Sequence, residues 1–130
     1  MRQRPLSPHA TVYRFQYTMI GSFAHRVSGL ALSAGLLVFV AWLAAAAGGW
    51  GSYAAAVALL SGPFAKGVLA LWLLAFCYHF FNGIRHLAWD LVFGLEKREA
   101  RRSYRMAIIA TLALFAALAW LLFARGGATP

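Results

Sequence analysis

The chain has 130 residues, of which 62% are hydrophobic and only 12% are charged. A typical soluble domain has about 25% charged residues, so this composition excludes an ordinary soluble protein and predicts a membrane protein. The net charge of +9 is explained by positive residues at one membrane face and by their attraction to lipid headgroups, so we expect membrane lipid and no nucleic acid as a partner.

Three uncharged apolar runs, residues 27–47, 67–84 and 106–124, can be read directly from the sequence. Each has about the 20 residues that a helix needs to cross the hydrocarbon core of a bilayer. Inside lipid the backbone polar groups must find partners within their own segment, which leaves helices as the only structure for such runs. We therefore predict an all-α fold in a single integral membrane domain, residues 1–130. Its spans are expected at about 22–47, 63–93 and 104–124, after a short N-terminal segment.

Local signals suggest where these helices begin and end. Pro63 is suited to the first turn of the second helix, where its missing N–H costs nothing. Gly94 is expected to end that helix after about residue 93, and Ser103 to cap the third helix. Trp50 and Tyr53 stand in a small-residue stretch between the first two spans and are expected to anchor it at the outer interface.

The orientation follows from the distribution of lysine and arginine. The segment before the first run and the link between the second and third runs contain most of them: Arg2, Arg4, Arg14, Arg26, Lys97, Arg98, Arg101, Arg102 and Arg105. The link 48–66 has only Lys66 and the tail only Arg125. Because positive residues stay on the cytoplasmic side, we expect a cytoplasmic N-terminus and a periplasmic C-terminus in a bacterial inner membrane.

The second span contains the motif HFFNGIRHLAWD at residues 79–90. His79 and His86 are seven residues apart and should face the same neighbour, with Gly83 on that face to let a flat group approach the helix. His79 is equally well interpreted as a polar packing residue or as a functional residue, because ionisable groups within spans are rare and often mark function. The single Cys77 excludes a covalently attached c-type haem and a cysteine-ligated cluster on this chain.

The first span begins with SFAHRVSG at residues 22–29. Ser22, His25, Arg26 and Gly29 are spaced so that they form one helical stripe, which we expect to point inward near the cytoplasmic boundary. The alternative is a basic turn that is attracted to anionic lipid. That alternative does not explain why serine, histidine and glycine should share the arginine's side of the helix.

Taken in order, these motifs resemble the cytochrome b membrane-anchor subunits of succinate dehydrogenase, respiratory complex II. The resemblance covers nearly the whole chain: RPLSPH at residues 4–9 followed by Tyr13, the S-x-x-H-R-x-S-G element at 22–29, and the H-x-x-x-G-I-R-H-x-x-W-D element at 79–90. The chain departs from the family at Ala10, where a bulky aliphatic residue is usual, and at Val92, where glycine is frequent. Neither position is one of the candidate haem-binding or quinone-binding residues.

The resemblance implies that His79 is an axial ligand of a non-covalent haem b, with the second axial histidine from a partner anchor subunit. It also implies that Ser22 and Arg26 line a ubiquinone site, and that His25, Arg26 and His86 lie near the haem propionates. Cationic groups at the cytoplasmic end suit propionates, while the iron ligand lies deeper in the apolar span.

Arg85 and Asp90 are candidates for ion pairs near the haem or the quinone, and Asp90 is equally well interpreted as an interfacial group at the end of the helix. The chain has no flavin motif and no cysteine cluster, so we expect succinate oxidation on soluble flavoprotein and iron–sulfur subunits that dock at the basic face. The alternatives are an anchor subunit of a fumarate reductase, a haem-free structural anchor, or a channel subunit. The third span argues against a channel because Thr111 is its only polar residue.

Overall fold

The computed structural model describes residues 16–124, so the RPLSPH motif and Tyr13 lie outside the described residues. The elements in chain order are α1 (Tyr17–Ala47), α2 (Trp50–Leu60), α3 (Pro63–Asp90), α4 (Lys97–Ala119) and a π-helical turn (Trp120–Ala124). The predicted all-α fold is confirmed: α1, α3 and α4 with its extension are each long and apolar enough to cross a membrane.

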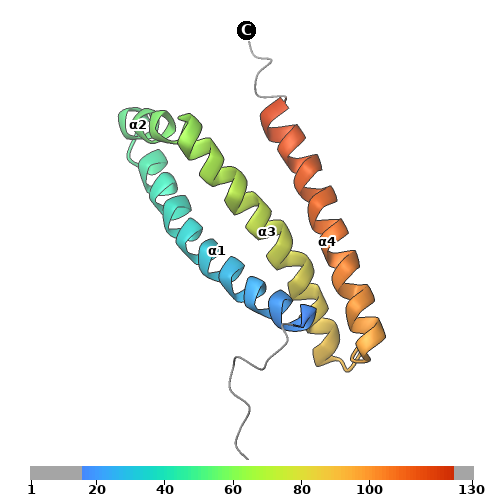
Figure 1. Cartoon of the computed structure of the whole chain (residues 1–130). Helices are drawn as coiled ribbons and strands as arrows, with labels where there is room; N and C mark the ends of the chain where they lie inside the picture. Colours follow the sequence, from blue (N-terminus) through green and yellow to red (C-terminus); the bar gives the residue numbers. More distant parts are fainter. Residues whose placement is uncertain (1–15, 125–130) are drawn as a thin grey trace, which may run out of the picture.

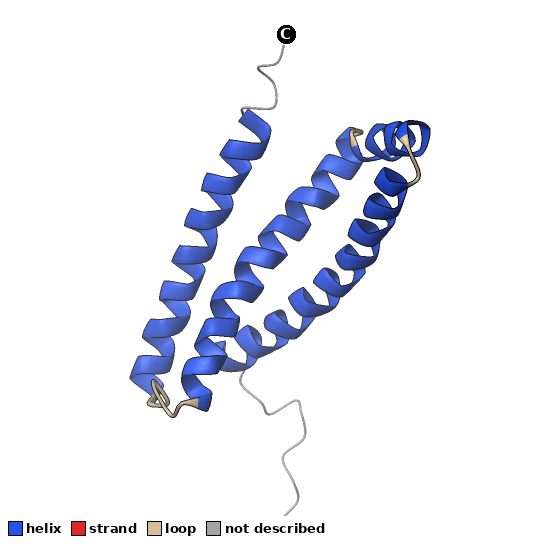
Figure 2. Ribbon diagram, turned by 180° about the vertical axis from the view of Figure 1, so that it is seen from behind, coloured by secondary structure: helices blue, strands red, loops and turns tan. Residues whose placement is uncertain are grey.

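The helix α3 lies between α1 and α4 and packs against both of them (Figure 1). The view from behind shows the same order, with the short α2 joining α1 and α3 at one end of the molecule (Figure 2). At the other end, the Tyr17 hydroxyl donates to the Lys97 carbonyl over 3.0 Å. The start of α1 and the α3–α4 link therefore lie side by side, as expected for two segments on the same membrane face.

Two helices begin earlier than predicted. The helix α1 starts at Tyr17 and has 31 residues, so at a rise of about 1.5 Å per residue it is longer than the roughly 30 Å hydrocarbon core. The helix α4 starts at Lys97 with Glu96 as its N-cap, so the prediction that Ser103 caps it was wrong. The lysine, arginine, glutamate and alanine residues before Ser103 are good helix formers, and the Ser103 hydroxyl donates to the Ala100 carbonyl inside the helix.

The end of α3 also differs from the prediction, because the helix stops at Asp90 rather than near residue 93. The N–H of Phe93 donates to the Ala88 carbonyl and the N–H of Val92 to the Trp89 carbonyl, which is the hydrogen-bond pattern of a Schellman motif. That motif needs a left-handed residue, and Val92 has φ 65°. A β-branched residue is strained there. Gly94, the predicted terminator, has φ 75° in the turn that follows.

The link between the first two spans contains the helix α2, which the sequence reading did not anticipate. Its alanine-rich sequence favours a helix once Gly48 and Gly49 have ended α1. The predicted place of Pro63 in the first turn of α3 is confirmed, with Gly62 as the N-cap. The Tyr53 ring packs between Trp42 of α1 and Trp50, at centroid distances of 6.2 and 5.9 Å.

The interior of the described part of the chain is small, and half of its buried residues carry a polar or charged side chain. Its buried residues, among those described, are Gly21, Ser28, Cys77, Asn82, Arg85, Ala100, Ala107 and Thr111. Large apolar side chains instead cover the outside of the helices. Small and polar residues at helix–helix contacts and apolar residues outside are what a membrane bundle requires, because lipid is as good a solvent for leucine as a protein core is.

Candidate functional site

Three histidines from two helices lie with their rings in contact and form the histidine cluster of His25, His79 and His86. The His25 ring of α1 lies against the His79 ring of α3, with 4.0 Å between centroids and 11° between planes. The His25 ring also contacts His86, at 4.9 Å and 34°. The prediction that His79 and His86 face the same neighbour is therefore confirmed, and that neighbour is His25.

His79 is bound to α1 through one ring nitrogen. Its Nδ1 lies 3.0 Å from the Ser28 hydroxyl oxygen and 3.1 Å from the His25 carbonyl oxygen. Within residues 16–124, all the hydrogen bonds of this side chain involve Nδ1. The nitrogen Nε2 therefore makes no hydrogen bond within these residues and can bind a partner outside the described part of the chain.

Glycines let the imidazole rings come close to the opposite helix. A Cβ on Gly29 would lie 3.0 Å from Cε1 of His79, which is tighter than most Cβ contacts in proteins. A Cβ on Gly83 would lie 4.0 Å from Cε1 of His25, an ordinary contact. The flat group beside Gly83 in this structure is thus the His25 ring, and the tighter approach is at Gly29.

His25 carries a buried polar atom without a partner. Its Nδ1 is enclosed and is the one such side-chain nitrogen or oxygen found among the described residues. An unsatisfied buried nitrogen costs about 1–3 kcal/mol, so it is expected mainly where it serves a purpose. Because Nδ1 is enclosed, contact with an anionic ligand would have to come from Nε2 of the same ring.

The four residues of the predicted stripe on α1 do not all contact the same neighbouring helix. His25 and Gly29 contact α3, whereas Ser22 is half-buried and Arg26 is exposed. Neither the Ser22 hydroxyl nor the Arg26 guanidinium is hydrogen-bonded to another residue in the described part of the chain. The two residues predicted for quinone binding lie one helical turn apart, and their roles stay predictions.

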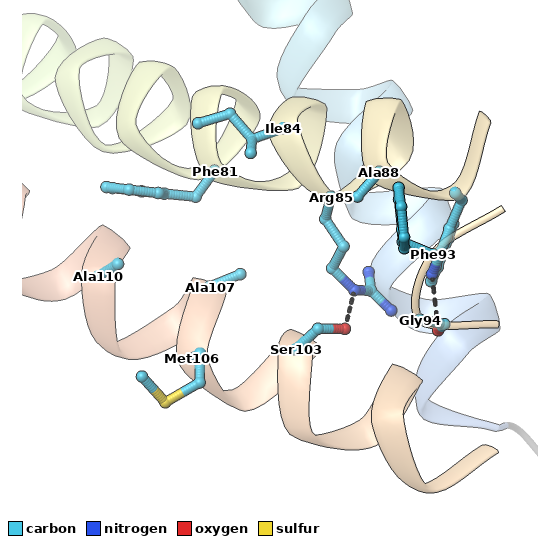
Figure 3. Close-up of a pocket in the computed structure, with 11 residues that line it drawn as sticks. Phe81, Ile84, Arg85, Ala88, Phe93, Gly94, Ser103, Met106, Ala107 and Ala110 are labelled. Carbon is cyan, nitrogen blue, oxygen red and sulfur yellow. Dashed lines mark hydrogen bonds between the residues drawn. The ribbon is translucent and has the colours of Figure 1, made fainter. Parts of the chain in front are cut away.

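Arg85 points toward α4, where it meets Ser103 (Figure 3). Its Nε donates to the Ser103 hydroxyl over 3.0 Å, and its terminal nitrogens donate to the Asn82 side chain and the Ala100 carbonyl, both over 3.3 Å. The guanidinium also lies 4.1 Å from the centroid of the Trp89 ring. Arg85 lines an apolar pocket of about 400 Å³ between α3 and α4.

Asp90 is exposed at the end of α3. No ion pair joins it to Arg85 in the structure of residues 16–124, since the guanidinium is occupied by α4 and by Asn82. The predicted roles of these two residues near a haem or a quinone remain predictions.

The histidine cluster fits one side of a haem and does not fit a metal ion held by protein side chains alone. No group of three or more histidine, cysteine, aspartate or glutamate side chains in residues 16–124 converges on a point, because stacked rings present their faces to one another. A haem iron is already held by four ring nitrogens and needs only axial ligands. One free imidazole nitrogen, at Nε2 of His79, is what a single helix can supply.

Two buried residues near this site were not predicted from the sequence. Ser28 and Asn82 are 7% and 0% exposed, and each bonds a residue that had been singled out. Both stand inside the quoted motifs, and a polar residue within an apolar span was the available signal. Their neighbours were not predictable, because the rotation of one helix against another is not encoded in the spacing along one of them.

Comparison with known proteins agrees with these features. A family model described as the succinate dehydrogenase/fumarate reductase transmembrane subunit matches residues 1–118. The succinate dehydrogenase cytochrome b556 subunit of Paracoccus denitrificans is 37% identical over 120 residues, which cover 92% of each chain. The mitochondrial succinate dehydrogenase cytochrome b560 subunit of Homo sapiens is 40% identical over 114 residues, 84% of this chain and 66% of the human protein.

A further relative, the succinate dehydrogenase cytochrome b556 subunit of Rickettsia prowazekii, is 36% identical over 94 residues, 72% of this chain and 73% of the relative. The match of the family model spans all three membrane helices nearly to the end of α4. The chain therefore belongs to the succinate dehydrogenase/fumarate reductase transmembrane subunit family, as a multi-pass cytochrome b membrane anchor of complex II.

Proposed function

We propose that this subunit anchors a succinate:quinone oxidoreductase, supplies one axial ligand of a haem b and forms part of a ubiquinone site. The observation that supports this most directly is the state of His79, which is bound to α1 through Nδ1 and keeps Nε2 free. His86 lies about two helical turns from His79 on α3 and cannot be the second ligand of the same iron. The resemblance to the family implies that the other axial histidine comes from a second membrane-anchor subunit. When bound, the haem supplies a one-electron redox centre.

The residues around His79 have complementary tasks in this proposal. His25, Arg26 and His86 hold the haem propionates, because imidazole N–H and guanidinium groups bind carboxylates through charge-assisted hydrogen bonds. The His25 and His86 rings are already in contact. Ser22 and Arg26 bind the quinone carbonyl from the half-buried and exposed positions that they take on α1.

The soluble partners dock at the basic end of the bundle. Lys97, Arg98, Arg101 and Arg105 line one hollow at the start of α4, and we assign this end to the cytoplasm. A flavoprotein subunit oxidises succinate there, and an iron–sulfur subunit passes electrons to the quinone. The same surface suits a fumarate reductase, whose anchors belong to the same family. A fumarate reductase is therefore the second candidate function, and the direction of electron flow distinguishes the two.

The experiment is a visible spectrum of the purified complex from wild type, His79→Ala and His86→Ala. We expect His79→Ala to remove the low-spin haem b signal while the complex still assembles in the membrane, since the substitution makes the span α3 more apolar. His86→Ala is the matched control on the same face and should lower haem occupancy without abolishing it. A complete low-spin spectrum in His79→Ala would refute the ligand assignment. Succinate and fumarate turnover on the wild-type complex decides the physiological direction.

A further inference from the structure

A closed triangle of polar atoms joins α1 to His79. The Ser28 side chain is 7% exposed, and its hydroxyl oxygen lies 2.7 Å from the His25 carbonyl oxygen and 3.0 Å from Nδ1 of His79. The third side, from Nδ1 to the His25 carbonyl oxygen, is 3.1 Å. Three atoms within hydrogen-bond distance of one another restrict where the protons can be.

The triangle determines which nitrogen of His79 carries hydrogen. The carbonyl oxygen of His25 can only accept, so both groups next to it have to donate. The Ser28 hydroxyl donates to the carbonyl, which leaves its oxygen to accept from Nδ1. An Nδ1 without a proton would instead place its lone pair against the lone pairs of the carbonyl oxygen, which is repulsive. The geometry therefore favours a hydrogen on Nδ1 of His79, and in the neutral imidazole this leaves on Nε2 the lone pair that a metal needs.

Gly29, the residue after Ser28, limits where the ring can lie. A Cβ at this position would be 3.0 Å from Cε1 and 3.5 Å from Nδ1 of His79. The imidazole is rigid, so a Cβ here would require the whole ring to shift by a few tenths of an ångström, which would disturb its hydrogen bond with the Ser28 hydroxyl. The pair Ser28 and Gly29 thus provides both the hydrogen bond and the space for it.

We propose that Ser28 and Gly29 are positioning residues that hold His79 as the Nδ1–H tautomer and tune the haem through it. This inference rests on the proposed function, in which His79 ligates the iron. A hydrogen bond donated by the outer nitrogen of a metal-bound imidazole raises the basicity of the ligating nitrogen. A more basic ligand favours the oxidised metal, so loss of the Ser28 acceptor should raise the midpoint potential of the haem.

The test uses the purified complex in five variants beside wild type. Ser28→Ala removes the hydroxyl, Ser28→Thr keeps it, and Gly29→Ala moves the ring. The matched controls are Ser33→Ala, whose exposed hydroxyl donates to the Gly29 carbonyl of its own helix over 3.0 Å, and Gly35→Ala. The new Cβ of Gly35→Ala would meet the Trp72 ring at 3.3 Å, far along α1 from the histidine cluster.

Three quantities are measured for each variant. They are the midpoint potential of the haem from a redox titration, the electron paramagnetic resonance signal of the ferric haem, and the amount of haem per complex. We expect a raised potential and a changed low-spin signal in Ser28→Ala and Gly29→Ala, recovery in Ser28→Thr, and wild-type values in both controls. An unchanged potential and signal in Ser28→Ala overturns the inference. If Ser28→Ala loses its haem, recovery of the haem in Ser28→Thr supports the inference, and failure of Ser28→Thr overturns it. His79→Ala is measured in parallel: a haem that survives there refutes the ligand assignment itself, independently of Ser28.

Discussion

The imidazole rings of His25 and His79 are stacked with 4.0 Å between their centroids, although the residues are 54 positions apart in the chain. This contact joins α1 to α3 at the level where the haem ligand is proposed. His25 therefore has a packing contact through its flat ring, beside the propionate contact that we propose for its nitrogens.

Replacing His25 with phenylalanine separates these contacts. His25→Phe keeps a flat ring beside His79 and removes a buried nitrogen that lacks a partner, so we expect the unfolding temperature of the complex to stay near wild type. Haem per complex should fall, because a ring without N–H groups cannot hold a propionate. His25→Ala, the control, should lower both quantities. Full haem content in His25→Phe would show that His25 has only a packing role.

The quinone assignment is tested at Ser22, which is half-buried on α1. We expect Ser22→Ala to reduce succinate-dependent quinone reduction strongly, because it removes a donor to the quinone carbonyl worth about 0.5–1.5 kcal/mol and misplaces the quinone for protonation. Haem content and succinate oxidation with an artificial acceptor should be retained. Ser33→Ala, an exposed serine on the same helix, is the control. Unchanged quinone turnover in Ser22→Ala at all quinone concentrations would remove Ser22 from the site.

Arg85 is expected to act mainly on stability. It is 6% exposed and donates to Asn82, Ala100 and Ser103, so Arg85→Ala should lower the free energy of unfolding by about 2–4 kcal/mol through unpaired acceptors and a cavity. Arg85→Met fills most of the volume and should cost less. Arg102→Ala, at an exposed position of α4, should stay within about 0.5 kcal/mol of wild type. Chemical denaturation of the complex measures all three.

The opposite result at Arg85 would also be informative. If Arg85→Ala leaves stability unchanged but abolishes haem binding or quinone turnover, the role near the haem or quinone that the motif suggested is correct. The α3–α4 hydrogen bonds would then be secondary to that role.

Val92 offers a stabilising substitution. Its φ of 65° lies in the left-handed region, which costs a residue with a Cβ about 1–2 kcal/mol and glycine almost nothing. Val92→Gly should therefore raise the unfolding temperature of the complex. Gly94→Ala, at φ 75°, should lower that temperature for the same reason. If both substitutions shift the temperature in the same direction, backbone strain does not control this turn.

The orientation is tested with reporter fusions in the two links. A reporter inserted after Ser61 should behave as periplasmic, and one inserted after Arg101 as cytoplasmic, because the positive residues gather in the second link. The reverse pattern would mean that partner subunits determine the orientation against the charge distribution.

The fold class and the number of spans were predictable from the sequence because they depend on local properties. Each apolar run has its own transfer free energy into lipid, and no tertiary contact is needed to keep it helical. The helix ends were less predictable. Ser103 resembled a cap but lies inside α4, where it accepts a hydrogen bond from Arg85. Val92 takes the left-handed position that was assigned to Gly94.

The sequence by itself determined that His79 and His86 share a face, because seven residues are close to two helical turns. Only the tertiary structure decided that His25 lies between them, that Ser28 binds His79, and that Arg85 reaches α4. These contacts depend on the rotation and separation of α1, α3 and α4. Close packing at small residues such as Gly29 determines how the helices are rotated and how far apart they lie. The spacing of residues within a single helix does not predict either.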